Sequence, residues 1–449
     1  MKIVIVGGGE VGFYLAKTLS AENHDIILLE KGHDTCKMLQ EQLDVFVIQD
    51  NGGSISALKQ AGIENADIFV AVTNVDCINI LSCTIASKIG NPVKIARVKD
   101  EDFLPEKYGM KSEDFGVDLI IHPEVEAAKE IVNLVKRSQA TDVIEFAEGK
   151  VQLIGLKMDR RDSTILGKKF KQVSQEVDKH LFRIVAVYRN GKTIIPTGED
   201  YIVRGDQVFV ISKVESIPDI LKLMGKEEEK LEYVMILGAG LVGVNVAKLL
   251  EEDKNLSVKL LEDDPVLANE AAEVLESSLV VRGHAKNIDL MAAEGIQDMD
   301  CFIATSIDDE DNLISCLVAK HIGVRKAIAL VNKSEYIPLI SAIGLDSAIS
   351  KKMTTINTIL RYIRRGQISS ISTIKGIDAE LLEFNVPEGA KISDKPLKDV
   401  NFPEGAIIGM IVRDGEAMIP TGDTKIYPGD TVIVFSLPWA IHKLEKLFI

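Results

Sequence analysis

The chain has 449 residues, which is enough for three or four domains of common size. Hydrophobic residues make up 46% and charged residues 27%, a composition typical of globular proteins. The 52 lysines and arginines stand against 68 aspartates and glutamates, which gives a formal net charge of −16. A surface that acidic repels phosphate backbones, so we expect no nucleic acid partner.

Cysteine spacing and hydropathy indicate the compartment. The five cysteines show no CxxC spacing, which favours buried thiols in a reducing cytosol over disulfides or a zinc site. No apolar stretch approaches the roughly 20 residues of a membrane-spanning helix, and "MKIVIVGG" runs directly into glycines instead of a leader sequence. We therefore expect a soluble, cytoplasmic protein whose link to any membrane depends on a partner.

The first part of the chain alternates short apolar runs with helix-length amphipathic stretches. Val11, Leu15 and Leu19 lie four residues apart, on one side of a predicted helix. The apolar runs are continuous, as in parallel strands that are covered on both faces. This alternation predicts an α/β fold with a doubly wound parallel, Rossmann-like sheet. The predicted strands are Lys2–Val6, Asp25–Glu30, Val45–Ile48, Asp67–Val72 and Val93–Val98.

A glycine-rich loop, "GGGEVG", follows the first predicted strand. In such a loop Gly7 makes the tight turn, Gly9 lets the backbone approach a pyrophosphate, and Gly12 lets the helix pack on the strand. Glu30 ends the second strand, where its carboxylate can accept both ribose hydroxyls and would repel a 2′-phosphate. The pattern favours NAD over NADP, although a loop that merely turns the chain remains the alternative.

Polar residues follow other predicted strands at the same sheet edge. Thr73 and Asn74, in "AVTNVD", lie where doubly wound folds bind ligands, or they serve as helix caps. Arg97 ends the fifth strand and could bind a phosphate or a carboxylate with two hydrogen bonds. Asp50, after the third strand, is a candidate contact on the adenosine side.

The sequence contains an internal repeat. "FVAVTNVDCINILSC" recurs as "FIATSIDDEDNLISC", and "IIPTGEDYIVRGDQVFVIS" recurs as "MIPTGDTKIYPGDTVIVFS". The second of these motifs lies in segments with alternating β-type runs, Gly and Pro turns and one short helix, which predict a small α+β domain. The charged "GKEEEKLE" separates the copies as a linker. The predicted parts are nucleotide-binding domains at 1–138 and 232–366, small C-terminal domains at 139–224 and 367–449, and a linker at 225–231.

The second copy repeats the glycine loop with Gly238, Gly240, Gly243 and Glu262, but Leu330 stands where the first copy has Arg97. We therefore expect the two sites to differ in affinity or in ligand. The counterpart of Asp50 lies near His284, across one deletion. The acidic run Asp308–Asp309–Glu310–Asp311 is better explained as a helix N-terminus that faces solvent than as a metal site.

The chemistry of a dehydrogenase is missing. No histidine recurs in both copies beside an arginine or aspartate as a proton donor, and we find no GxxxxGK[ST] loop and no HExxH. We infer that the chain senses a nucleotide and does not consume it. An NAD-dependent oxidoreductase with duplicated Rossmann folds is the alternative.

Together these motifs resemble the TrkA family of Trk potassium-uptake regulatory proteins, and the resemblance covers essentially the whole chain. It rests on "MKIVIVGGGEVGFYLAKTLS", "ILLEK", "AVTNVDCINILSC", "ARV" and "IPTGEDYIVRGDQVFVI", with their repeats. The resemblance implies two tandem RCK units (regulators of potassium conductance). It also implies a non-enzymatic subunit that is peripheral on the inner face of the membrane. The implied partner is a TrkH-like potassium-translocating subunit, gated in response to NAD(H) or ATP/ADP. The family's ring of eight nucleotide-binding lobes implies a homotetramer here.

A regulator of another cation channel or antiporter remains open as an alternative within the same modules. The resemblance also implies binding residues in both lobes, with the departure at Leu330 leaving the second site in doubt. They are Gly7, Gly8, Gly9, Glu10, Val11, Glu30, Thr73, Asn74 and Arg97, and then Gly238, Ala239, Gly240, Leu241, Val242 and Glu262.

Overall fold

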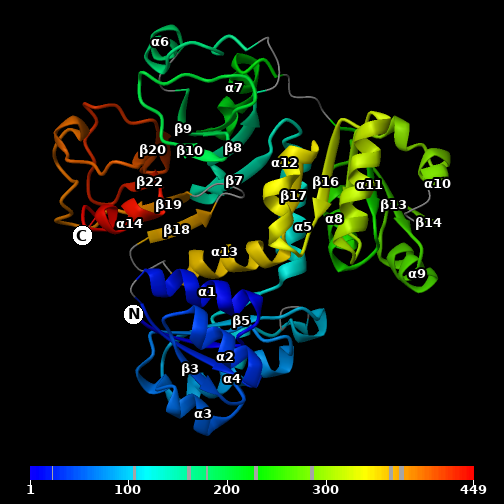
Figure 1. Cartoon of the computed structure of the whole chain (residues 1–449), viewed down its shortest axis with the longest axis vertical. Coiled ribbons are helices and arrows are strands. Elements are labelled where there is room, and N and C mark those ends of the chain that lie inside the picture. Colours follow the sequence, from blue (N-terminus) through cyan, green and yellow to red (C-terminus); the bar gives the residue numbers. More distant parts are fainter. Residues whose placement is uncertain are drawn as a thin grey trace. The chain divides into compact units, whose positions relative to one another are not determined.

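The structure is a computed structural model in which the chain forms two compact units (Figure 1). One unit combines Met1–Ala127 with Ser350–Ile363, and the other combines Ala128–Ile349 with Arg364–Ile449. The first unit thus takes in a helix from far along the chain. The structure describes residues 1–22, 24–104, 108–158, 163–177, 181–226, 231–283, 288–363, 368–373 and 379–448.

A six-stranded parallel sheet is the centre of the first unit. Its order is β3-β2-β1-β4-β5-β6, so the direction of winding reverses between β1 and β4. Ligands of doubly wound sheets bind at this switch point, outside the carboxyl ends of the strands. The strands are β1 (Lys2–Val6), β2 (Asp25–Glu30), β3 (Phe46–Gln49), β4 (Ile68–Ala71), β5 (Val93–Arg97) and β6 (Leu119–Ile121).

The core of this unit is completed by α13 (Lys351–Ile363), a helix of the second sequence repeat (Figure 1). Its Ile356, Ile359 and Leu360 are buried in one cluster with Leu15 of α1. These positions follow the i, i+3, i+4 spacing of one helix face, and burial of each such side chain stabilises the fold by about 1.5–3 kcal/mol. The unit's other helices are α1 (Glu10–Ala21), α2 (His33–Gln42), α3 (Ile55–Gln60) and α4 (Asp76–Ile89).

The second unit contains a parallel sheet with the same topology, ordered β14-β13-β12-β15-β16-β17. Its strands are β12 (Tyr233–Leu237), β13 (Ser257–Glu262), β14 (Leu279–Arg282), β15 (Cys301–Ala304), β16 (Lys326–Leu330) and β17 (Ser347–Ile349). Its helices are α8 (Leu241–Glu251), α9 (Pro265–Val274), α10 (Ile288–Ala293), α11 (Asp309–Ile322) and α12 (Ile340–Ile343).

Helix α5 (Pro123–Lys136) runs from the first unit into the second, where buried Lys326 holds its end. The Lys326 Nζ lies 2.7–3.0 Å from the carbonyl oxygens of Leu134, Arg137, Ser138 and Ala140. These groups are at or just beyond the C-terminus of α5, where backbone carbonyls have no partner within the helix. The lysine therefore takes the role of a C-cap supplied by the second repeat.

Two antiparallel sheets complete the second unit, each with five strands. Residues of both sheets, among them Phe209 and Phe435, share one hydrophobic cluster. The first sheet has β7 (Asp142–Phe146), β8 (Val151–Lys157), β9 (Phe182–Arg189), β10 (Lys192–Ile194) and β11 (Gln207–Lys213), with α6 (Phe170–Glu176) and α7 (Ile217–Leu223). The second has β18 (Ile368–Thr373), β19 (Glu380–Asn385), β20 (Ala406–Arg413), β21 (Glu416–Met418) and β22 (Thr431–Ser436), with α14 (Pro438–Glu445).

The predicted fold class is confirmed: two parallel Rossmann-like sheets and two small antiparallel α+β parts. The five predicted strands of the first sheet agree with β1–β5 to within one residue at each end. The three-residue strand β6 is not among the predicted strands, and α6 and α7 both form where one short helix is predicted. Most of the predicted linker, residues 227–230, lies outside the described part. No described helix has the length and apolar character to cross a membrane.

Candidate functional site

The first glycine loop is tightly constrained at its ends and open in its middle. Gly7 has a φ of +104°, and a Cβ there would lie 2.9 Å from the Thr73 backbone nitrogen. A Cβ on Gly12 would lie 1.9 Å from the Gly7 carbonyl oxygen, so helix α1 packs too closely on the loop for any side chain. A Cβ on Gly9 would meet no atom within 4 Å. The loop therefore leaves space at the residue where a phosphate would approach the backbone.

Helix α1 begins directly after this open residue. Gly9 is its N-cap and has no side chain to accept a hydrogen bond from the first turn. The unpaired N–H groups and the positive end of the helix dipole favour an anion at this position. Of the two residues that follow, Glu10 is exposed and Val11 is buried. The loop thus has the geometry of a pyrophosphate cradle, with one carboxylate at its rim.

Glu30 joins the glycine loop to the end of β2. Its Oε2 accepts a hydrogen bond from the Gly8 backbone nitrogen at 2.7 Å, and its Oε1 accepts one from the Gly32 nitrogen at 2.7 Å. A carboxylate has about four lone-pair sites, so both oxygens can accept further bonds from a ribose. Asp50 lies beside it at the end of β3, where its own N–H donates to the Glu30 carbonyl oxygen at 3.1 Å. The Asp50 carboxylate is exposed and accepts from the Asn51 nitrogen.

A buried asparagine, Asn79 of α4, fixes two of the three remaining predicted residues, Thr73 and Arg97. Its Oδ1 accepts from the Thr73 nitrogen at 2.9 Å and from the Thr73 hydroxyl at 2.7 Å. Its Nδ2 donates to the carbonyl oxygens of Thr73 at 3.1 Å and Arg97 at 2.8 Å. One fully buried amide therefore ties the end of β4 to the end of the neighbouring strand β5. Asn74 lies close by, 3.5 Å from an Arg97 guanidinium nitrogen.

Arg97 lies in a buried cluster of charged and polar groups. Burial lowers the pKa of Arg97, while the carboxylates of Glu124 and Asp76 act in the opposite direction. Among the described residues, the buried Arg97 Nε, His122 Nε2, one Glu124 oxygen and one Asp76 oxygen have no hydrogen-bond partner. Buried polar atoms are nearly always paired in native proteins, so this set is suited to receive a further polar group.

The second glycine loop repeats the first in detail. Gly238 has a φ of +96°, a Cβ on Gly243 would lie 2.0 Å from the Gly238 carbonyl oxygen, and a Cβ on Gly240 would meet nothing within 4 Å. Glu262 Oε2 accepts from the Ala239 nitrogen at 2.6 Å, and its Oε1 accepts from two backbone nitrogens after β13. The following Leu241 is exposed and Val242 is buried, as in the first loop, but without the Glu10 carboxylate.

The second site differs from the first at its sheet edge. Asn312 of α11 makes the same set of bonds as Asn79, including one from its Nδ2 to the Leu330 carbonyl oxygen at 2.9 Å. The side chain of Leu330 is buried and apolar, so this edge has no counterpart of the Arg97 cation. The region near His284 lies outside the described residues.

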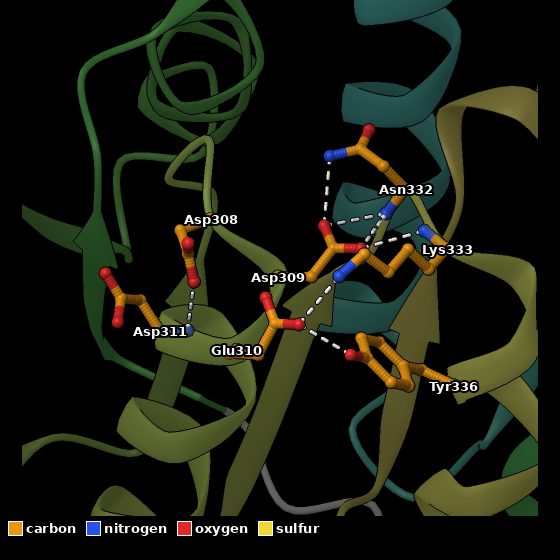
Figure 2. A network of polar contacts seen from close by, with 7 residues as sticks. All are labelled: Asp308, Asp309, Glu310, Asp311, Asn332, Lys333 and Tyr336. Carbon is orange, nitrogen blue, oxygen red and sulfur yellow. Dashed lines mark hydrogen bonds and ion pairs between the residues drawn. The ribbon is translucent and has the colours of Figure 1, made fainter.

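The acidic run at the start of α11 is a structural network (Figure 2). Asp308 caps the helix by accepting from the Asp311 nitrogen at 2.9 Å, and Asp309 accepts from the backbone nitrogens of Asn332 and Lys333. Lys333 and Tyr336 bind Glu310 and lower its pKa to about 2. Among the described residues no group of three acidic, histidine or cysteine side chains could hold a metal ion.

The residues that position the site are not among the binding residues predicted from the sequence. Asn79 and Asn312 are buried amides on the inner faces of α4 and α11, and they occupy the same place in both copies. Asp76 and Asp309 likewise each accept hydrogen bonds from two consecutive backbone nitrogens after β5 and β16. Comparison of the two repeats, position by position, would have singled out all four.

Comparison with known families gives two matches that are each duplicated. The TrkA-N domain matches residues 3–123 and 234–351, and the TrkA-C domain matches residues 160–225 and 381–449. Together these matches cover most of the chain, in the order expected from the internal repeat.

Curated relatives match over the full length. The Trk system potassium uptake protein TrkA homolog 1 of Methanosarcina mazei is 36% identical over 455 residues, covering 100% of both chains. The TrkA homolog of Archaeoglobus fulgidus is 35% identical, also over 100% of both chains. The TrkA of Halomonas elongata is 32% identical over 100% of this chain and 98% of the relative.

Solved structures share the fold at lower identity. The GsuK channel, solved alone and bound to NAD, matches with a TM-score of 0.62 and 17% identity in each case, and the matches cover 99% and 100% of this chain and 78% of the channel. The isolated GsuK RCK domain matches with a TM-score of 0.60 over 100% of this chain and 94% of that chain. With full-length relatives above 30% identity and duplicated domain matches, the chain belongs to the TrkA family of Trk potassium-uptake proteins.

Proposed function

We propose that this chain is the nucleotide-binding regulatory subunit of a Trk-type potassium uptake system. In this proposal it lies on the cytoplasmic face of the membrane against a TrkH-like potassium-translocating subunit, and it controls ion flow through that subunit. The proposal is supported by relatives that are named as potassium uptake proteins and by the fold shared with the RCK domain of a channel.

The first lobe is the principal site, and its ligand is NAD(H) or an adenine nucleotide such as ATP or ADP. The observation that carries this proposal is the open space at Gly9, next to a helix N-terminus and near the carboxylate of Glu30. Structures of the GsuK channel bound to NAD and to ADP support the ligand class. The proposed contacts in this lobe are Gly7, Gly8, Gly9, Glu10, Val11, Gly12, Glu30, Asp50, Thr73, Asn74 and Arg97.

The second lobe binds a nucleotide more weakly or binds a different one. Its glycine loop and Glu262 repeat the geometry of the first, but Leu330 supplies no charge where a phosphate could lie. The proposed contacts are Gly238, Ala239, Gly240, Leu241, Val242, Gly243 and Glu262. Domain boundaries at residues 138, 224, 231 and 366 remain part of this proposal.

The nucleotide is sensed and not converted. Binding can shift a gate only as far as the nucleotide prefers one conformation of the assembly over another. A preference of about 1–3 kcal/mol per site gives a 5- to 150-fold change in affinity, and several sites in a homotetramer multiply its effect. The chain's own task is therefore to bind and orient the phosphates and ribose at the switch point of each sheet.

Calorimetry on the full-length protein with NAD, NADH, ATP and ADP, together with its mass in solution, tests the proposal. We expect binding of at least one of these nucleotides, a tetramer, and altered potassium flux in vesicles that contain the partner membrane protein. Absence of binding by all four nucleotides would refute the sensor. A steady change in nicotinamide absorbance with a small alcohol or acid would identify an oxidoreductase instead.

A further inference from the structure

Helix α13 brings two consecutive lysines of the second repeat to the first lobe, Lys352 beside the glycine loop and Lys351 beside Glu124 at the sheet edge. Lys352 is buried, with its Nζ 3.3 Å from the Glu10 Oε2 and 5.0 Å from the centre of the Tyr14 ring. Lys351 lies one residue earlier, with its Nζ 3.8 Å from the Glu124 Oε1. Neither lysine belongs to the TrkA-N match that contains the loop it approaches, because that match ends at residue 123.

These ion pairs are longer than well-formed charged hydrogen bonds. Lysine–carboxylate bonds of full strength measure about 2.7–2.9 Å, so pairs at 3.3 and 3.8 Å leave ammonium protons for a better acceptor. Glu10 is in the first turn of α1, where a phosphate would be favoured by the helix dipole. Its carboxylate would repel that phosphate unless a cation such as Lys352 offsets it.

Further cations and unpaired nitrogens lie at this place, together with the carboxylates of Glu124 and Asp76. Burial lowers the pKa of Lys99 and the neighbouring cations Arg97 and Lys351 lower it further, while the carboxylates of Glu124 and Asp76 act in the opposite direction. Cations gathered in this way in a chain of net charge −16 are stabilised by an anion between them. The Arg97 Nε and the Nε2 of His122, a side chain 94% buried, have no hydrogen-bond partner among the described residues.

We propose that Lys351 and Lys352 form a subsite for the γ-phosphate of an ATP molecule bound to the first glycine loop. This inference rests on the proposed function and extends it to the number of phosphates. In the bound state Lys352 gives up its ion pair with Glu10 and binds the phosphate, and Lys351 does the same with its ion pair to Glu124. Arg97 stays at the sheet edge. ADP and NAD have no γ-phosphate, so with either of them bound both lysines remain paired with their carboxylates. A helix of the second repeat thereby distinguishes ATP from ADP and NAD.

Calorimetry on the full-length protein with ATP, ADP and NAD tests this subsite. Charged hydrogen bonds contribute about 1.5–3 kcal/mol, so we expect Lys352→Met to weaken ATP at least about tenfold and to change ADP and NAD much less. Lys17→Met is the matched control, because Lys17 is exposed on the same lobe and the change removes the same charge. An equal loss for all three nucleotides in K352M, or no loss for ATP, overturns the subsite.

Glu10→Gln is expected to raise the affinity for ATP, whereas Lys352→Met is expected to lower it. The side chain is 73% exposed, so the variant is expected to fold, and circular dichroism verifies this. Removal of the carboxylate frees Lys352 and ends the repulsion of phosphate, so ATP should bind more tightly in E10Q. Unchanged or weaker ATP binding there contradicts the inference, even if K352M fails to fold. If the wild-type protein binds no nucleotide, the proposed function itself fails, which is a different result.

Discussion

Asn79 donates a hydrogen bond from its Nδ2 to the carbonyl oxygen of Arg97 at 2.8 Å, although the two residues are 18 positions apart. The same amide holds Thr73, so one side chain sets the distance between two strand ends that form the candidate site. The same bond recurs between Asn312 and Leu330 in the second lobe, where the uncharged Leu330 takes the place of Arg97. The positioning device is therefore retained in both lobes even though the group it positions differs.

Asn79→Leu should lower the free energy of unfolding by about 2–4 kcal/mol, because it leaves buried backbone groups of Thr73 and Arg97 without partners. Urea denaturation measures the loss, and calorimetry should show weaker nucleotide binding in the first lobe. Asn312→Leu is the matched control, since it removes the same bonds from the second lobe. If both variants weaken the first lobe's ligand equally, Asn79 does not position that site.

Gly9→Asp should abolish nucleotide binding in the first lobe with the fold retained, because a side chain there meets no protein atom but would fill the phosphate position with a negative charge. Gly12→Ala should instead destabilise the lobe, since its methyl group would lie 1.9 Å from the Gly7 carbonyl oxygen. Thermal unfolding and calorimetry on both variants separate the two effects. Normal affinity in folded G9D would remove the site from the glycine loop.

Glu30→Ala should weaken NAD binding about tenfold or more, because it removes the acceptor proposed for the ribose hydroxyls and two hydrogen bonds that hold the loop. Glu30→Gln retains the shape and part of the hydrogen bonding, so we expect a smaller loss. Glu262→Ala makes the same change in the other lobe. Calorimetry that shows NAD affinity intact in E30A would refute the ribose role.

Lys326 predicts a pH dependence of stability. Burial lowers its pKa from 10.5 to about 8, so between pH 8 and 10.5 the unfolded chain binds more protons than the folded one. The free energy of unfolding contributed by this group should therefore rise with pH across that window. Urea denaturation at pH 7, 8, 9 and 10 measures it in the wild type.

Lys326→Met is the comparison for that series. It should be less stable, because carbonyl oxygens at the end of α5 lose their donor, and its curve should lack the rise that Lys326 contributes. If the wild type and K326M change in parallel from pH 8 to 10, the titration belongs to other groups.

Local patterns in the sequence were sufficient to predict the strands β1 to β5 and the glycine loops. Continuous apolar runs identify β1 to β5 because both faces of a parallel sheet are buried. The GxGxxG motif with Glu30 predicts the loop because its turn and its close helix packing leave no room for side chains. The strand β6 could not be predicted, because three apolar residues are too few to show the hydrophobic periodicity of a strand or of a helix. The lysines of α13 could not be assigned to the first lobe, because no local signal states which sheet a distant helix will cover.

The placement of α13 also has a consequence for biosynthesis. The first lobe acquires Ile356, Ile359 and Leu360 only after the ribosome has synthesised more than two hundred further residues beyond its last strand. Contacts of such long sequence separation form late and slow the search for the native state. A nascent chain that ends before residue 351 therefore exposes the apolar face of α1, and a stop codon there is expected to yield an aggregation-prone fragment instead of a free-standing half.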